Sequence, residues 1–366
     1  MRIEELTFFR FLAASIVVIF HFGKDLEGIP GFLRSGPEMV TFFFVLSGFV
    51  MGISYFNKPV VATKYLWARF SRITPVYFLA LGLVLASMVL SHQSINPIAL
   101  LLNVTFLQSW VSPFPLSLNG PGWSLSVEAF FYCAFPLILI CIKQLSLTSK
   151  AVLGIGLGFW VAVHLATTYV LSSDGYEGYP SFSHDMIYYF PPTHLCSFIL
   201  GIAGAIWIYE QKSTVNKNSW LTIAVVVVCF SIVVILNNKR PIEEYFGLSL
   251  AFGSSLLSPL FLLFIVLIAW CDSRLIALFR SYPLVLLGEA SYAFYILQKP
   301  VHILYEKYMP REILTNEWIS FSVFFLLLTG VSICVFYFFE KPMNNFLRHR
   351  VPAWFSKQKS VLTEAP

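Results

Sequence analysis

Two ionisable side chains stand in the first apolar stretch of this chain, RFLAASIVVIFHFG, residues 10–23. Over the eleven residues from Arg10 to His21, an α-helix turns about 1100°, roughly 20° beyond three full turns. Both side chains therefore share one helix face, roughly 16 Å apart along the axis. Histidine is suited to accept a proton near neutral pH or to act as a nucleophile. His21 is the first candidate catalytic residue; the alternative is that both residues only anchor the helix at the two membrane interfaces.

A carboxylate follows a Pro/Gly-rich stretch in GPGWSLSVEAFFY, residues 120–132. Trp123 suits a membrane interface, and Ser124 is placed to cap the helix that begins there. Glu128 lies in the first two turns, where it is expected to orient an imidazole as the third member of a catalytic triad does. The alternative is that it satisfies backbone N–H groups of the irregular segment before it.

Paired arginines occur at the end of the 57–72 loop. Arg69 and Arg72 are three residues apart, so they share a helix face. Forked guanidinium groups bind phosphate well, with Lys64 as a further cation of the loop; the alternative is anchoring to anionic lipid. Glu340, at the end of the last apolar segment, is expected to pair with one of these arginines.

Two further apolar segments carry small or hydroxylated residues. Ser47 and Gly48 lie in the middle of FFFVLSGFVMG, where small residues permit close helix contact or line a passage. The segment LGEASYAFYILQKP places Tyr292 and Tyr295 on one helical stripe. Such a stripe suits a sugar or the amides of a pantetheine arm, and it also suits ordinary hydrogen bonds between helices.

The composition sets the fold class. The chain is 57% hydrophobic and 12% charged, whereas soluble domains carry about a quarter charged residues. A helix needs roughly 20 apolar residues to cross a bilayer, and such runs recur along the chain. The sequence predicts an all-α, polytopic membrane protein with apolar segments at 6–23, 38–56, 73–91, 97–112, 122–143, 150–172, 193–210, 220–237, 247–271, 284–305 and 317–340.

The loop charges predict the orientation. The 57–72 loop is rich in Lys and Arg and should be cytoplasmic. The 173–192 loop carries three acidic residues, Asp174, Glu177 and Asp185, with no Lys or Arg, and should be external. These constraints agree if 97–112 does not cross fully. We therefore expect ten spanning helices, one short re-entrant segment, an outer 113–121 stretch and two cytoplasmic termini.

No second folded domain and no metal site are expected. The membrane-embedded domain should cover 1–345, and 346–366 should form a short basic tail. The six cysteines form neither a CxxC pair nor a metal-ligand spacing. The net charge of +5 lies mostly in loops, so it indicates membrane orientation and not nucleic-acid binding.

Five stretches, in this order, resemble the acyltransferase 3 family of bacterial membrane acyltransferases that modify surface glycans. They are the Arg-x10-His of Arg10 and His21, FFxxSGF at 43–49, Arg-x-x-Arg-Ile-x-Pro at 69–75, GWSLSVE at 122–128 and FEKP at 339–342. They cover roughly residues 1–345. Many relatives carry a histidine where this chain has Gln298-Lys299-Pro300.

The resemblance implies a bacterial inner-membrane enzyme. Its co-substrate would be cytoplasmic acyl-CoA, most often acetyl-CoA, and it would O-acylate a sugar hydroxyl of a surface or exported polysaccharide, or of a lipid-linked oligosaccharide. The donor's arm would thread along the Arg10–His21 stripe. The site assigned to it comprises catalytic His21, Glu128 and Arg10; donor-binding Arg69, Arg72, Lys64 and Ser47; and substrate-binding Trp123, Ser124, Tyr292 and Tyr295.

Other functions remain open on the sequence alone. A glycan or lipid transporter also combines many helices with buried charges, although no inverted repeat is visible. An acyltransferase with a non-glycan acceptor or another acyl group fits as well. The sequence does not separate direct transfer from an acyl-histidine intermediate.

Overall fold

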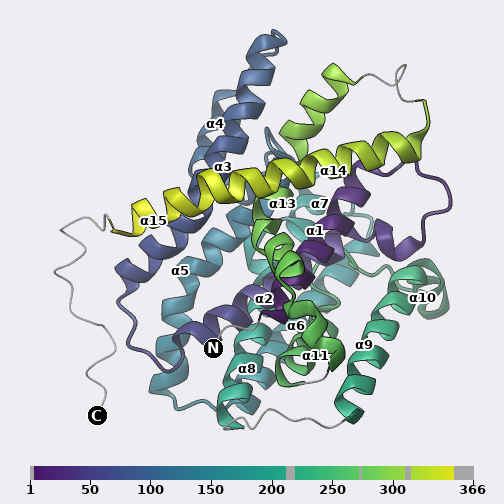
Figure 1. Cartoon of the computed structure of the whole chain (residues 1–366). Coiled ribbons are helices and arrows are strands. Elements are labelled where there is room, and N and C mark those ends of the chain that lie inside the picture. Colours follow the sequence, from purple (N-terminus) through teal and green to yellow (C-terminus); the bar gives the residue numbers. More distant parts are fainter. Residues whose placement is uncertain (1–3, 212–218, 272–273, 310–314, 350–366) are drawn as a thin grey trace.

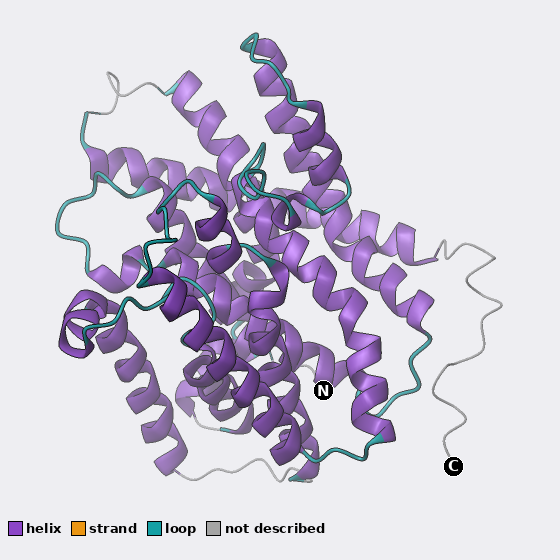
Figure 2. Cartoon of the chain, turned by 180° about the vertical axis from the view of Figure 1, so that it is seen from behind, coloured by secondary structure: helices purple, strands orange, loops and turns teal. Residues whose placement is uncertain are grey.

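The computed structural model describes residues 4–211, 219–271, 274–309 and 315–349, and every regular element in these ranges is helical (Figures 1 and 2). Eight helical stretches in the described part are long and apolar enough to cross a membrane. The prediction of an all-α, polytopic membrane protein is therefore confirmed.

The long helices correspond to the predicted segments. Eight of them are long and apolar enough to cross a membrane. Helix α8 reaches that length only when the short helices before it are counted with it. They are α1 (Glu5–Phe22), α2 (Gly36–Tyr55), α3 (Ala62–Leu90), α5 (Trp123–Gln144), α6 (Ser149–Leu171), α8 (Leu195–Glu210), α9 (Ser219–Asn237) and α14 (Glu317–Val335). The other two predicted helices are α11 (Ser258–Trp270), which is shorter, and α13 (Tyr282–Tyr308), which is long but more polar.

Short elements connect these helices. α14 continues through a π-helical turn into α15, and together they form a long rod that crosses the bundle obliquely (Figure 1). The short elements are η1 (Gly31–Arg34), α4 (Pro97–Val104), η2 (Gln108–Trp110), η3 (Gly120–Gly122), α7 (Phe182–Tyr188), η4 (Pro191–His194), α10 (Lys239–Phe246), α12 (Arg274–Ala277), η5 (Leu278–Arg280), η6 (Phe336–Glu340) and α15 (Lys341–His349).

The 97–112 segment does not cross the bundle, as predicted. Helix α4 has 8 residues, about 12 Å at 1.5 Å per residue, far short of a hydrocarbon core about 30 Å thick. Its buried Asn103 donates to Ser117 Oγ over 2.9 Å, and the Asn103 carbonyl accepts from Tyr77 over 2.8 Å. The irregular backbone here is held by other parts of the protein, which is where a membrane protein tolerates it.

Two helix boundaries differ from the prediction. The 57–72 stretch was expected to be a loop, but α3 begins at Ala62 and continues through Pro75. A proline removes only one helical hydrogen bond, and membrane helices tolerate this loss. The 247–271 segment is helical only from Ser258, and the buried Ser254 and Ser255 precede it in irregular backbone.

Two contacts show which loops share an end of the bundle. Lys143 Nζ donates to the Lys58 carbonyl over 3.4 Å, so the loops after α2 and α5 meet. At the other end, Ser112 Oγ donates to Asp185 over 2.6 Å, which joins the stretch after α4 to the 173–192 loop. The basic loops and the acidic loop thus lie apart, as the sequence predicted.

Small residues set the closest helix contacts. A Cβ atom on Gly48 of α2 would lie 2.0 Å from the Phe198 carbonyl oxygen of α8, and one on Gly201 of α8 would lie 2.0 Å from the Val45 oxygen. Gly288 of α13 approaches the Thr7 carbonyl of α1 equally closely. Because a larger side chain would separate these backbones, the glycines fix α2 on α8 and α13 on α1. Helix α1 thereby lies in the middle of the bundle, beside α13 and α2 (Figure 1).

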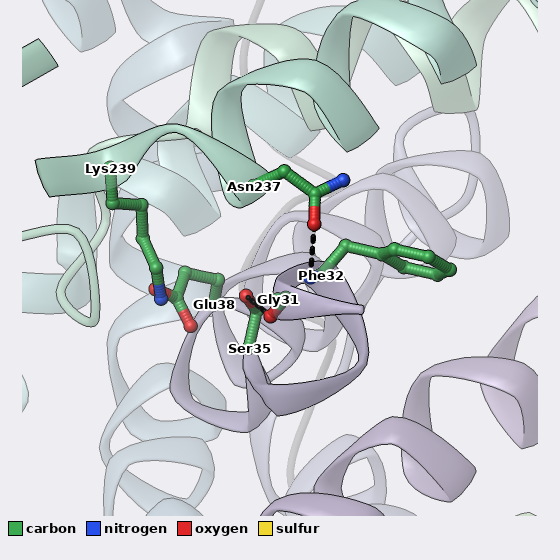
Figure 3. A network of polar contacts seen from close by, with 6 residues as sticks. All are labelled: Gly31, Phe32, Ser35, Glu38, Asn237 and Lys239. Carbon is green, nitrogen blue, oxygen red and sulfur yellow. Dashed lines mark hydrogen bonds and ion pairs between the residues drawn. The ribbon is translucent and has the colours of Figure 1, made fainter. Parts of the chain in front are cut away.

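A polar network fixes the turn that follows α1 (Figure 3). The Phe32 N–H in η1 donates to Asn237 Oδ1 at the end of α9 over 3.0 Å. The buried Glu38 of α2 forms an ion pair with Lys239, with 2.6 Å between Oε1 and Nζ. The end of α1 that carries His21 is therefore tied to α9 as well as to its immediate neighbours.

The basic tail is only partly described. Residues 341–349 form α15, and Trp67 of α3 donates through its indole N–H to the Leu347 carbonyl over 2.9 Å. The rest of the predicted 346–366 tail, from residue 350, lies outside the described residues.

Candidate active site

One cavity between α1, α2, α3, α5 and α13 collects most of the residues singled out from the sequence. Its volume is about 120 Å³. The lining includes eight of the predicted site residues, namely Arg10, Ser47, Arg69, Arg72, Ser124, Glu128, Tyr292 and Tyr295. Five helices thus bring most of the predicted site residues together, whereas His21, Lys64 and Trp123 are not part of the lining.

The cavity carries more positive than negative charge. Three arginines line it, Arg10 from α1 and Arg69 and Arg72 from α3, against one carboxylate, Glu128. Arg72, Glu128 and Glu340 are the charged groups that act on Arg10. Such a cavity attracts an anionic ligand or a developing oxyanion, because charge interactions are stronger away from bulk water.

Arg69 is held by two tyrosines that do not themselves line the cavity. Its Nη2 donates to the Tyr55 hydroxyl over 3.1 Å, and its guanidinium carbon lies 5.1 Å from the Tyr55 ring centroid and 5.9 Å from that of Tyr65. Arg69 Nε has no hydrogen-bond partner within the described residues. The tyrosines therefore fix the guanidinium and leave one of its N–H donors available to a ligand.

Glu340 does not form the predicted ion pair. It is buried at the end of the π-helical turn, and its Oε2 atom has no hydrogen-bond partner in the described part of the chain. Arg72 and Arg10 still act on it through their charges. The carboxylate thus balances part of the arginine charge at longer range instead of contacting one guanidinium.

Glu128 faces the cavity from α5 but does not hold His21. Ser47 Oγ of α2 donates to Glu128 Oε1 over 3.5 Å. Tyr132, one helical turn further along α5, lines the same wall. The hydrogen bond that the imidazole was predicted to donate to Glu128 is therefore absent among the described contacts, and a catalytic role of Glu128 stays a prediction.

The hydroxyl stripe of α13 forms another wall. The Tyr292 hydroxyl donates to the Ile73 carbonyl of α3, and the Tyr295 hydroxyl lies 2.9 Å from Ser124 Oγ of α5. Tyr295 is buried and also donates to the Pro121 carbonyl over 3.2 Å. These contacts confirm that the stripe forms ordinary hydrogen bonds between helices, and both tyrosines also line the cavity. Their binding of a sugar or a pantetheine arm stays a prediction.

His21 stands near the cavity but outside its lining. It occupies the last turn of α1, its side chain is exposed, and its Nδ1 lies 2.8 Å from Gln298 Oε1 of α13. Gln298 is fully buried, and its Nε2 donates to the Tyr295 carbonyl over 2.6 Å. The imidazole is thus linked through one glutamine to a residue that lines the cavity.

The Pro/Gly-rich stretch is docked on α13 for a physical reason. Pro300 has no N–H, so the Ile296 carbonyl four residues earlier loses its helical donor. The buried Asn119 supplies one, from Nδ2 over 3.0 Å, and Lys299 Nζ binds the Leu118 carbonyl. This docking places the start of α5, with Ser124 and Glu128, beside α13.

Two predicted residues lie elsewhere. Trp123 is 8% exposed and packs against Phe44, Tyr189 and His194, with the nearest of these ring centroids, that of Tyr189, at 5.1 Å. The Lys64 side chain is exposed at the start of α3 and does not line the cavity. Their predicted contacts with substrate and donor stay predictions.

Sequence reasoning missed several residues of this site. The spacing of Tyr132 from Glu128 could have indicated a shared face. Asn119 and Gln298 carry no such local pattern, because their partners lie 177 and 277 residues away along the chain. Pro300 is the one local signal, because it leaves the carbonyl four residues earlier without a donor that a side chain can then supply.

Comparisons with known proteins agree with the motif resemblance. A family model described as an acyltransferase domain, acyltransferase 3, matches residues 3–340. The acyltransferase MdmB of Streptomyces mycarofaciens is 29% identical over 226 residues, which are 56% of this chain and 57% of that protein.

Two further relatives are named for O-acetyl transfer. The peptidoglycan O-acetyltransferase OatA of Listeria monocytogenes is 26% identical over 318 residues, 80% of this chain and 48% of that protein. A putative O-acetyltransferase of Staphylococcus aureus is 25% identical over 314 residues, 78% of this chain and 48% of that protein. The chain thus spans about half the length of these curated relatives. No solved structure matches it significantly.

Proposed function

The chain belongs to the acyltransferase 3 family, and from that premise we propose that it is a membrane O-acyltransferase using acyl-CoA, acetyl-CoA in the simplest case. The acceptor would be a sugar hydroxyl of a surface or exported polysaccharide. One observation carries the proposal: three arginines line a single cavity, and α1, which contributes one of them, also carries His21. The relatives named as acyltransferases favour transfer over transport.

The cavity suits the arm of the donor more than its head group. Its volume of about 120 Å³ is below the roughly 300–1,000 Å³ of pockets that enclose a whole drug-sized ligand. We therefore place only the narrow pantetheine arm inside, against Tyr292, Tyr295 and Ser47. The CoA phosphates would remain at Arg69 and Arg72, whose forked donors match phosphate oxygens.

The reaction would join an acceptor oxygen to the thioester carbon. The acceptor hydroxyl gives its proton to His21 as its oxygen attacks the carbonyl, and the tetrahedral oxyanion then collapses with cleavage of the C–S bond. The CoA thiolate leaves and takes up the proton. Arg10 faces the cavity from the same helix face, but roughly 16 Å of helix axis separate it from His21. Its charge would therefore attract the anionic donor into the cavity and would not contact the oxyanion.

A covalent route uses the same residues. His21 attacks the thioester carbon, the C–S bond breaks, and the CoA thiolate leaves and takes the proton that the acylated ring gives up. The acceptor oxygen then attacks the acyl-imidazole, the C–N bond breaks, and the acceptor's proton returns to the freed imidazole. Rapid quenching with acyl-CoA alone, followed by peptide mass spectrometry, would reveal the added acyl mass on His21. Its appearance at a rate matching turnover supports this route, and its absence supports direct transfer.

The charge distribution supports an orientation in the bacterial inner membrane. The basic loops that meet at Lys58 and Lys143 would face the cytoplasm with both termini, and the end near Asp185 would face outward. Acyl-CoA would then enter from the cytoplasmic side, and His21 would meet the acceptor near the outer side.

The decisive experiment uses a matched pair of histidine variants. His21→Ala should abolish acyl transfer, measured as release of CoA thiol and as acylated glycan by mass spectrometry. The control is His92→Asn, because His92 is exposed and has a φ of 53°, which asparagine tolerates. Turnover of His21→Ala equal to that of the control would remove His21 from the chemistry and refute the proposed mechanism. Absence of acyl transfer by the wild type itself would refute the proposed function.

The acceptor class is tested separately. Mass spectrometry of purified peptidoglycan, capsular and lipid-linked glycans, with and without the gene, should show one fraction losing acyl groups. Loss from peptidoglycan would match the activity for which the Listeria relative is named. Loss from a small secreted molecule, with all glycans unchanged, would refute the glycan assignment.

A further inference from the structure

The amide of Gln298 has only one orientation that its surroundings allow. One end lies 2.6 Å from the Tyr295 carbonyl oxygen, and the other lies 2.8 Å from His21 Nδ1. A carbonyl oxygen accepts hydrogen bonds and never donates one, so the end facing Tyr295 is the NH₂ group. The end facing His21 is therefore the amide oxygen.

This orientation determines the proton on the imidazole. The Gln298 oxygen only accepts, so His21 Nδ1 must carry a hydrogen for the contact to be a hydrogen bond. A neutral imidazole carries one N–H, and its other nitrogen holds a lone pair. The lone pair is then on Nε2, on the far side of the ring from Gln298.

The burial and hydrogen bonds of Gln298 keep His21 in this tautomer. Gln298 is 0% exposed, and both of its amide atoms are occupied, so rotation would cost two buried hydrogen bonds. Glutamine does not titrate, so its acceptor does not change with pH. The close backbone contact of α1 and α13 at Gly288 holds the two helices that carry the pair.

From this geometry we infer that Gln298 is a positioning residue, which keeps His21 in the Nδ1–H tautomer and so assigns Nε2 as the nitrogen that takes the acceptor proton or the acyl group. The inference rests on the proposed function of His21 and deepens it. A fixed tautomer matters because a catalytic histidine presents its lone pair to the reacting proton only from one nitrogen.

The first test needs no substitution at Gln298. Protein labelled with 15N-histidine in lipid nanodiscs gives imidazole 15N resonances, and His21 is assigned as the one absent from His21→Ala. Above the pH at which the ring is charged, Nε2 should show the chemical shift of an unprotonated nitrogen and Nδ1 that of an N–H. The reverse pattern, or an average of the two, would overturn the inference.

The second test separates positioning from folding. Gln298→Met keeps the length and loses both hydrogen bonds, and it should lower kcat about 10–100-fold, the range known for residues that orient metal-bound histidines, with the KM for acyl-CoA unchanged. Gln298→Glu restores an acceptor but adds a negative charge, which favours the charged ring. The acid limb of its pH profile should move to higher pH, with activity regained there.

The comparison variant is Tyr305→Phe, which removes another buried hydrogen bond of α13, from the Tyr305 hydroxyl to the Ser320 carbonyl. Its kcat and pH profile should match those of the wild type. Apart from position 298, all variants keep the same charged and titratable groups at the end of the bundle where α1 ends. Lys24 acts on His21 through its charge, and the others are Asp25, Arg34, Glu38, Lys299 and His302.

The outcomes distinguish the inference from the proposed function. An active His21→Ala refutes the proposed role of His21 and the inference with it, whereas a wild type without acyl transfer refutes the proposed function. An inactive His21→Ala beside Gln298→Met with wild-type kcat and pH profile refutes only the inference. Loss of folding in Gln298→Met, seen as aggregation on size exclusion, leaves the decision to the wild-type 15N spectrum.

Discussion

A methyl group added at Gly48, which does not line the cavity, should narrow it by displacing α2. An ideal Cβ at this position lies 2.0 Å from the backbone oxygen of Phe198 in α8, whereas ordinary contact begins at 3.4 Å. The difference of about 1.4 Å cannot be absorbed by a side chain, because the obstacle is backbone on both helices. Gly48→Ala therefore has to move α2 away from α8.

The displaced helix carries a wall of the cavity. Phe43, Ser47 and Val50 of α2 line it, and the face that meets α8 is the opposite one. A misplacement of about 1 Å can cost about 100-fold in rate. We expect kcat/KM for acyl-CoA to fall about 100-fold, equivalent to roughly 2.7 kcal/mol, and overpacking to cost about 1–3 kcal/mol of stability.

The matched control is Gly82→Ala in α3, because a Cβ there meets nothing within 4 Å. Alanine is the better helix former, by about 0.5–1 kcal/mol, so this variant should be as stable as the wild type or slightly more so. Both proteins are compared in nanodiscs by CoA thiol release and by thermal unfolding. If Gly48→Ala kept kcat/KM within twofold of the control at an equal Tm, the tight contact of α2 and α8 would be wrong.

Three further outcomes are expected. Arg69→Ala combined with Arg72→Ala should raise the KM for acyl-CoA at least tenfold, since charge-assisted hydrogen bonds contribute about 1.5–3 kcal/mol each; Lys58→Ala, exposed in the loop before α3 and outside the cavity, should change it less than threefold, and equal effects would place the donor elsewhere. Asn119→Ala should leave the Ile296 carbonyl without a donor and lower stability by about 1–3 kcal/mol in a denaturation series, whereas an unchanged midpoint would mean that Pro300 needs no compensation. In a cysteine-free background, Phe114→Cys should react with an impermeant maleimide on whole spheroplasts and Lys58→Cys only after lysis; the opposite labelling would invert the proposed orientation.

The sequence by itself determined the helices and much of the site's membership. Membrane helices satisfy their backbone hydrogen bonds internally, so apolar length predicts them locally, and 97–112 was correctly expected not to cross. Charges within or beside apolar segments are costly and therefore mark functional sites, which is why Arg10, Arg69 and Arg72 stand out in the sequence. The structure confirmed that all three line one cavity.

Only the tertiary structure determined which of these side chains are in contact. The imidazole of His21 faces Gln298 and not Glu128, and Glu340 contacts neither predicted arginine. Apolar periodicity gives the faces of each helix but not its neighbour, rotation or depth, and those depend on backbone contacts such as Gly288 on Thr7. Pairings between residues hundreds of positions apart thus arise from packing, because no local interaction encodes them.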